Sequence, residues 1–270
     1  MNFSFLDFLN LCGGLGLFLF GMTMMSESLQ KVAGDKMRAI LAGMTKNRVM
    51  GVLTGVAITS IIQSSSATTV MVVSFVNAGL LSLAESITVI MGANICTTVT
   101  AWLVSLVGFQ FSIADIAIPL IGLSIPLLFS KRDKRKSIGQ LMVGFALLFI
   151  GLEYLKNSVP DINSNPEVLA FLQHYSNMGY GSVLLFVLVG TILTLIMQSS
   201  SATMAITLVM LNQGWINFKV AAAMVMGENI GTTITANLAA IPANANARRA
   251  ALSHTLFNVL GVVWLLIVFY

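Results

Sequence analysis

Charged residues are scarce in this chain. Asp, Glu, Lys and Arg together make up 9% of its 270 residues, whereas a soluble globular protein has about 25%. Hydrophobic residues make up 57%, and the mean hydropathy is +0.90. This composition excludes a soluble domain. It predicts an all-α integral protein of the cell membrane that crosses the bilayer several times, because long apolar helices satisfy their own backbone in lipid.

Cysteine and histidine are scarce as well. The two cysteines, Cys12 and Cys96, are too few for a disulfide framework or a thiolate metal site. The two histidines, His174 and His254, give an intramembrane serine hydrolase no evident general base, and no Gly-x-Ser-x-Gly segment occurs. We therefore predict that the chain is not an enzyme and has no cofactor. Because its basic residues lie in loops that orient a membrane protein, we expect no nucleic-acid partner.

One hexapeptide, Gln-Ser-Ser-Ser-Ala-Thr, occurs at 63–68 and again at 198–203. When residues 55–101 are laid over 190–236 without a gap, 19 of 47 positions are identical. The identities gather on polar residues and glycines, while the apolar residues between them have diverged. We therefore predict that the chain contains two copies of one repeat. The copies are residues 1–136 and 137–270.

The lengths of the apolar runs predict how each copy meets the membrane. A helix needs about 20 apolar residues to cross. The runs 49–81 and 181–213 would each form a straight helix roughly 50 Å long, and each is interrupted near its middle by the hexapeptide. We predict that each forms a re-entrant helical hairpin with the hexapeptide at its tip. Full spans are predicted at 10–29, 86–107, 112–130, 137–156, 220–241 and 250–270.

The placement of Lys and Arg supports the hairpins. These residues favour short cytoplasmic loops. With two re-entrant hairpins, twelve of the fourteen basic residues lie on the cytoplasmic side, whereas straight crossings would leave six there and eight outside. Three crossings then separate the copies, which makes them an inverted repeat and places both termini outside. The basic run 131–136 is expected to set this topology first and to contact membrane lipid headgroups second.

Each tip has the chemistry of an anion site beside a cation site. Three hydroxyls and the free N–H groups of a restarting helix suit an oxyanion such as phosphate. Amide, hydroxyl and backbone oxygens suit an alkali cation. The candidate phosphate-binding residues are Ser64, Ser65, Ser66, Ser199, Ser200 and Ser201. The candidate sodium-binding residues at the tips are Gln63, Thr68, Gln198 and Thr203. Those in the segments that follow the tips are Asn94, Thr97, Thr98, Glu228, Asn229, Thr232 and Thr233.

A second block, Gly-x-Asn-Ile-x-Thr-Thr, is shared at 92–98 and 227–233. Its Gly, Asn and Thr residues predict a second pair of helix breaks, in which side chains satisfy freed backbone groups. Glu228 is the one acidic residue of these blocks, and we interpret it as a cation ligand or proton acceptor. Two alternatives stay open. Small polar residues in spans often serve helix packing instead, and Glu228 could lie at a watery helix end.

The doubled hexapeptide and the Asn-Thr-Thr blocks resemble the type II sodium–phosphate cotransporter family from Gly14 to about Asn258. Cys96 stands where that family has glycine, whereas Gly231 keeps it. The resemblance implies a symporter that moves inorganic phosphate with Na⁺ as the coupling ion, by alternating access at the hairpin tips. It also implies a PhoU-like cytoplasmic partner or further domain. A homodimer, a transporter or exporter of another small anion, and a non-transporting membrane scaffold or sensor stay open as alternatives.

Overall fold

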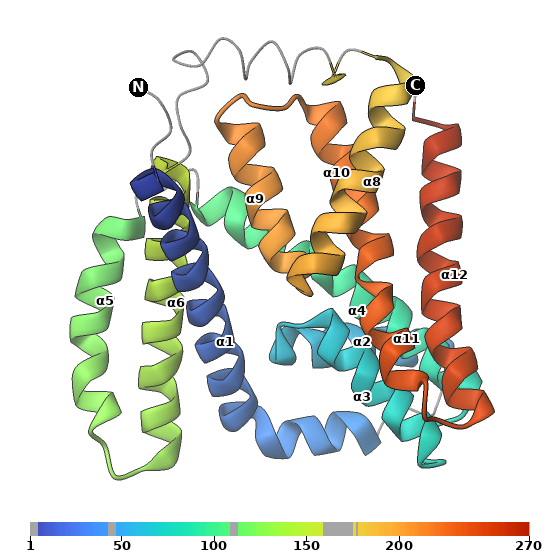
Figure 1. Ribbon diagram of the computed structural model, residues 1–270. Helices are drawn as coiled ribbons and strands as arrows, with labels where there is room; N and C mark the ends of the chain where they lie inside the picture. Colours follow the sequence, from blue (N-terminus) through green and yellow to red (C-terminus); the bar gives the residue numbers. More distant parts are fainter. Residues whose placement is uncertain (1–4, 43–46, 109–112, 159–174, 177, 270) are drawn as a thin grey trace. The chain divides into compact units, whose positions relative to one another are not determined.

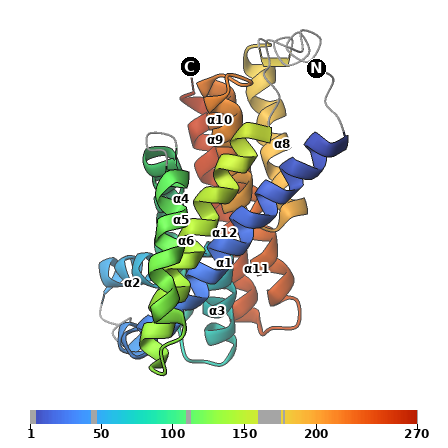
Figure 2. The ribbon, with the colours of Figure 1, turned by 90° about the vertical axis from the view of Figure 1, so that its left-hand side faces the viewer.

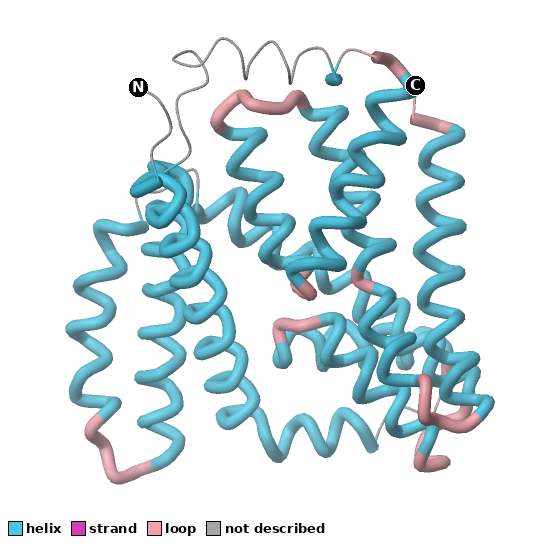
Figure 3. The backbone as a smooth tube through the Cα atoms, in the orientation of Figure 1, coloured by secondary structure: helices cyan, strands magenta, loops and turns pink. Residues whose placement is uncertain are grey.

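The computed structural model describes residues 5–42, 47–108, 113–158, 175–176 and 178–269, and within these ranges the elements are helices without strands (Figures 1 and 3). The first helices are α1 (Phe5–Ala42), α2 (Arg48–Ile62), α3 (Ser65–Asn77), α4 (Leu83–Trp102), the π-helical turn η1 (Leu103–Gly108) and α5 (Ile113–Leu128). The later ones are α6 (Asp133–Ser158), α8 (Tyr180–Met197), α9 (Ser200–Asn212), α10 (Phe218–Gly231), α11 (Thr233–Ala240) and α12 (Ala245–Ile267). His174 lies outside the described residues.

Five helices in the described part of the chain are long and apolar enough to cross a membrane. Four of them contain the predicted spans 10–29, 86–107, 137–156 and 250–270 or most of each. The fifth is α8, the first arm of the predicted hairpin 181–213. These helices establish a multi-pass membrane protein by length and composition.

Two predicted spans differ from the structure. The span at 112–130 appears as α5, which has only 16 residues and ends where the polar turn before the basic run begins. The span at 220–241 is divided into α10 and α11 at Thr232. Among the described residues, four of the six predicted full spans are therefore borne out as helices long enough to cross, and the runs 112–130 and 220–241 are not among them.

The chain groups into two compact units, and each takes segments from both halves of the sequence. Unit 1 contains residues 1–32, 101–186 and 204–224. Unit 2 contains residues 33–100, 187–203 and 225–270. The division into repeats at 1–136 and 137–270 concerns the duplicated sequence, and it stays a prediction.

In unit 1, α5 and α6 lie side by side and the first part of α1 packs along α6 (Figures 1 and 2). Glycines make the α1–α6 approach close: a Cβ added at Gly21 would overlap the backbone of Leu148. Phe18 of α1 and Leu148 and Leu152 of α6 form part of a buried apolar cluster. The candidate site described below is built from residues of unit 2.

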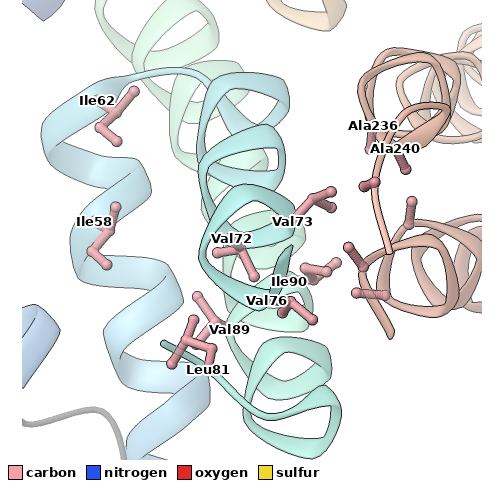
Figure 4. Close-up of a cluster of buried hydrophobic side chains, with 14 residues drawn as sticks. Ile58, Ile62, Val72, Val73, Val76, Leu81, Val89, Ile90, Ala236 and Ala240 are labelled. Carbon is pink, nitrogen blue, oxygen red and sulfur yellow. The ribbon is translucent and has the colours of Figure 1, made fainter. Parts of the chain in front are cut away.

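In unit 2, α2 and α3 form a helical hairpin that packs on α4 and α11 (Figure 4). Ile58 of α2 and Val72 of α3 are both fully buried and face each other across the hairpin. On its other side α3 turns Val73 toward Ala236 and Ala240 of α11. The apolar packing lies along the arms of the hairpin, so the polar tip is left for other contacts.

Candidate functional site

Both hexapeptides interrupt a helix in the same way. Gln63 and Gln198 have positive φ angles of 54° and 52°, and they are the only non-glycine residues with positive φ in the described part of the chain. This left-handed conformation ends a helix, and it costs a non-glycine residue on the order of 1–3 kcal/mol. The side-chain amide of Gln63 donates to the Ser60 carbonyl, and that of Gln198 donates to the Leu195 carbonyl. These hydrogen bonds offset the strain and fix the turn, and Figure 3 shows the loop that each break forms between its two helices.

The first serine of each tip caps the helix that follows. Ser64 has extended dihedrals, and its Oγ accepts a hydrogen bond from the Ala67 N–H at 3.2 Å. Ser199 Oγ accepts one from the Ala202 N–H at 3.3 Å. An N-cap serine satisfies one of the free N–H groups of the first turn. Ser64 and Ser199, both predicted to bind phosphate, therefore also cap the helices that follow them.

The next two serines of each tip keep their hydroxyls available. The hydroxyls of Ser65, Ser66, Ser200 and Ser201 make no hydrogen bond with any residue that the structure describes. Ser65 is 6% exposed and Ser200 is 8% exposed. Because buried hydroxyls in native proteins usually have a partner, these groups are suited to a bound ligand or water.

One pocket in unit 2 brings the two tips together. It is lined by Gln63 and Ser65 of the first tip and by Ser201 of the second. The remaining lining residues are Thr59 of α2 and Cys96, Thr97 and Thr100 of α4. About 220 Å³ within it, including space open to solvent, is free of protein atoms. Its polar atoms are hydroxyl, amide and thiol groups without a charged side chain.

The predicted sodium residues of the first copy lie in different surroundings. Gln63 and Thr97 line the pocket. Thr68 is fully buried behind the tip, where its hydroxyl donates to the Ser64 carbonyl. Thr98 is exposed, and its hydroxyl donates to the Ile95 carbonyl. Two of these five residues therefore line the pocket. The remaining one, Asn94, is hydrogen-bonded to α12.

Asn94 is held in a polar network between α4 and α12. Its amide donates to Asn258 Oδ1 at 2.6 Å, and its carbonyl oxygen lies 3.1 Å from His254 Nε2. Asn258 in turn donates to the His254 carbonyl at 2.9 Å. His254 is 1% exposed, and its Nε2 takes part in this network through Asn94.

The second-copy residues are mostly buried. Glu228 is 2% exposed on α10, and Asn229 beside it is half-buried. Thr232 and Thr233 are 6% and 4% exposed, and their hydroxyls donate to carbonyls one turn earlier. Gln198, although exposed, accepts a hydrogen bond from the Thr235 hydroxyl at 3.0 Å. Thr203 lies behind its tip, fully buried.

The prediction of a helix break at 92–98 is wrong. Helix α4 runs without interruption from Leu83 to Trp102. Its Thr97 and Thr98 hydroxyls bond to carbonyls of their own helix, and Asn94 is used by α12, so no freed backbone has to be satisfied. In the second block the interruption is a single residue, Thr232, which keeps helical dihedrals.

Sequence reasoning missed two threonines and the α12 network. Thr59 and Thr100 line the pocket, although neither belongs to a motif. The overlay of the two copies contained a signal for both, because Thr59 matches Thr194 and Thr100 matches Thr235 as identities outside the motifs. His254 and Asn258 belong to the stretch that resembles the family, but they lie beyond the overlaid segments, and their contact with Asn94 could not be read from the sequence.

These features define a multi-pass helical membrane protein in which two broken helices contribute to one uncharged polar pocket. The chain matches the family described as Na+/Pi-cotransporter over residues 17–157 and 170–269. This match covers most of the chain, so the protein belongs to the Na+/Pi-cotransporter family, as the motifs predicted. No solved structure matches it.

The relatives match either nearly the whole chain or about a third of it. The chain is 30% identical over 256 residues to "Putative inorganic phosphate export protein YjbB" of Escherichia coli O157:H7, covering 95% of this chain and 46% of that protein. It is 32% identical over 252 residues to "Uncharacterized protein YqeW" of Bacillus subtilis, covering 92% and 78%. It is 42% identical over 100 residues to rat "Sodium-dependent phosphate transport protein 2A", covering 35% and 15%. The chain thus spans about half the length of the YjbB proteins.

Proposed function

We propose that this protein is a sodium-coupled transporter of inorganic phosphate that works by alternating access. The observation that carries the proposal is the pocket, where Ser65 of one tip and Ser201 of the other line the same space. Membership of the Na+/Pi-cotransporter family supports phosphate as the substrate. The printed names of YjbB and of the rat relative point in the same direction.

In this proposal the anion is bound without a basic residue. The hydroxyls of Ser65 and Ser201 donate to phosphate oxygens, assisted by the free N–H groups and positive dipole ends at the starts of α3 and α9. Sodium lies beside it on the amide oxygen of Gln63 and the hydroxyl oxygens of Thr97 and Thr100. Neutral oxygen atoms at close range are the ligands that interrupted membrane helices offer to alkali cations.

The proposal includes re-entrant hairpins and an inverted repeat. With 15 and 13 residues, α2 and α3 are about 22 and 20 Å long, whereas the hydrocarbon core is about 30 Å thick. Two such arms suit a hairpin that enters and returns on the same side. The equal backbone geometry at Gln63 and Gln198 supports a repeat, and the twelve-to-two split of basic residues supports its inversion.

Export is the second candidate direction, and the name of the E. coli relative favours it. The direction of a secondary transporter follows its gradients. Each Na⁺ that enters down 100 mV supplies about 2.3 kcal/mol, so sodium coupling favours import, whereas export requires another driving force or a high internal phosphate concentration. In this proposal, Glu228 ligates the cation or accepts a proton. A homodimer, a PhoU-like partner and external termini stay predictions.

Uptake into proteoliposomes tests the proposal. Labelled phosphate should accumulate when a sodium gradient is imposed, and a potassium gradient of equal size should leave uptake at the level of empty liposomes. Arsenate should compete, whereas sulfate should not. Efflux from phosphate-loaded vesicles, measured with and without sodium outside, separates the two directions. Absence of phosphate movement under all these gradients would leave a scaffold or sensor, or another anion, as the function.

A further inference from the structure

Behind each tip, two threonine hydroxyls join the helix that enters the break to the helix that leaves it. Thr59 Oγ1 of α2 donates to Thr68 Oγ1 of α3 at 3.1 Å. Thr194 Oγ1 of α8 donates to Thr203 Oγ1 of α9 at 3.2 Å. All four side chains are buried. The two hydrogen bonds stand at equivalent positions of the repeat, because the overlay of the copies aligns both threonines of one pair with those of the other.

Each threonine pair is connected to the turn itself. Thr68 Oγ1 donates its own proton to the Ser64 carbonyl at 2.9 Å, and Thr203 Oγ1 donates to the Ser199 carbonyl at 3.2 Å. The Thr59 carbonyl accepts from the Gln63 N–H at 2.6 Å, and the Thr194 carbonyl accepts from the Gln198 N–H at 2.9 Å. Both sides of each left-handed Gln turn are therefore held by the same pair.

We propose that these two hydrogen-bonded pairs, the threonine clasps Thr59–Thr68 and Thr194–Thr203, are positioning residues of the transport site. Each clasp holds its Gln-Ser turn so that the serines that follow reach the pocket. The inference rests on the proposed function. It also gives Thr68 and Thr203 a role other than sodium ligation, because the hydroxyl of each donates to the tip carbonyl, which for Thr203 shares the donor with the Met197 sulfur at 3.8 Å.

The chemistry of the clasp separates hydrogen bonding from packing. A buried hydroxyl that loses its partner has no water to replace it, so the cost of breaking a clasp is felt at the turn. Valine has the shape of threonine without the hydroxyl, whereas serine keeps the hydroxyl and loses the methyl group. If the clasp acts by its hydrogen bond, serine substitutes for Thr59 and valine does not. If Thr59 only fills space, the order reverses.

The chain supplies a matched control in Thr69. It follows Thr68 on α3 and is 1% exposed. Within the described residues its hydroxyl bonds only to the Ser65 carbonyl of its own helix, at 2.8 Å, and not to α2. Its counterpart in the second copy is Met204, so an apolar side chain already occupies that position. Thr69→Val therefore removes a buried hydroxyl from the same helix while the clasp stays intact.

The first test needs no substrate. Hydrogen–deuterium exchange is measured on peptides that cover 60–68 in the full chain in lipid nanodiscs. Thr59→Val should raise exchange at the tip about two- to tenfold, whereas Thr59→Ser and Thr69→Val should exchange like the wild type. Thr194→Val and Thr194→Ser repeat the comparison at 195–203. Exchange at the wild-type rate in both Thr59→Val and Thr194→Val would overturn the clasp. Equal acceleration of exchange in Thr59→Ser and Thr194→Ser would overturn it as well.

The second test asks whether the clasp positions the site. In proteoliposomes, Thr59→Val should raise the apparent KM for phosphate about two- to tenfold with a smaller change in the maximal rate, and Thr59→Ser should restore it. A normal KM together with faster tip exchange would reduce the clasp to a stabilising contact and overturn the positioning role. If the wild type moves no phosphate, the proposed function fails, and the exchange experiment still decides whether the clasp exists.

Discussion

Alanine substitutions of two adjacent serines at the first tip should affect different properties, one the stability of the fold and the other the affinity for phosphate. Ser64→Ala and Ser65→Ala each remove one hydroxyl from neighbouring positions. Ser64 Oγ caps α3 through the Ala67 N–H at 3.2 Å. Ser65 is 6% exposed and lines the pocket, and its hydroxyl makes no hydrogen bond within the described residues. One substitution therefore removes a structural contact, and the other removes a group available to phosphate.

The magnitudes follow from these contacts. Loss of an N-cap hydroxyl costs about 1 kcal/mol of folding free energy, so Ser64→Ala should lower the thermal stability of the substrate-free protein. Loss of a hydrogen bond to a charged partner costs about 1.5–3 kcal/mol, which corresponds to roughly ten- to a hundredfold in affinity. Ser65→Ala should therefore raise the apparent KM for phosphate by that factor and leave the stability without phosphate unchanged.

The assay pairs phosphate uptake into proteoliposomes with thermal unfolding in detergent without phosphate. Ser201→Ala repeats the affinity loss at the second tip, because Ser201 lines the same pocket, and Ser199→Ala repeats the stability loss, because Ser199 caps α9. Near-normal phosphate affinity in both Ser65→Ala and Ser201→Ala would refute the site. Equal loss of folded protein in the Ser64 and Ser65 variants would show that both serines are structural.

Three further predictions address the cation, the pocket and the topology. Gln63→Ala should raise the sodium concentration for half-maximal uptake more than the phosphate KM, because an amide oxygen favours the cation; equal shifts in both would contradict this. In a Cys12→Ser background, a small thiol reagent should inactivate the protein through Cys96, and phosphate with sodium should slow this inactivation. An unchanged rate of inactivation with phosphate and sodium present would show that Cys96 lies away from the substrate. Asn47→Cys and Ser82→Cys, in a chain without native cysteines, should both be labelled from the cytoplasmic side, and labelling from opposite sides would rule out a re-entrant hairpin.

The breaks at the two hexapeptides could be predicted from sequence because length and polarity agree there. The apolar run 49–81 is too long for one crossing, and the polar tetrapeptide Gln-Ser-Ser-Ser lies at its middle. The structure ends α2 at Ile62 and begins α3 at Ser65, on either side of the predicted tip. The local signal is strong because a left-handed Gln, a capping serine and a restarted helix all depend on neighbouring residues.

The second pair of breaks could not be judged in the same way. Gly92, Asn94 and the two threonines that follow have the composition of a break, yet α4 continues through them. Asn94 bonds to Asn258 on α12, and this contact between distant parts of the sequence cannot be read from local composition. Gly92 serves helix packing, since a Cβ there would overlap the carbonyl oxygen of Val52. Tertiary contacts decided both positions.

The pattern of identity between the copies follows the hydrogen bonds of the tips. Thr59, Gln63, Ser64 and Thr68 each take part in the turn or in the clasp behind it, and each is identical to its counterpart in the second copy. Most apolar residues elsewhere in the overlay differ, because many side chains can fill a lipid-facing or packed surface, whereas few can hold a left-handed turn at a helix break. The geometry of the break is therefore what the two copies share.

The Asn-Thr-Thr blocks differ between the copies in sequence and in contacts. Cys96 lines the pocket where the second copy has Gly231. Glu228 is buried where the first copy has Ala93, and Asn94 is bound to α12 where Asn229 has no such network in the described part of the chain. Two equal tips can bind one anion symmetrically, but a carboxylate on one side only makes the surroundings unequal. Any difference in cation dependence between the two faces of the cycle should therefore follow Glu228 before it follows either set of serines.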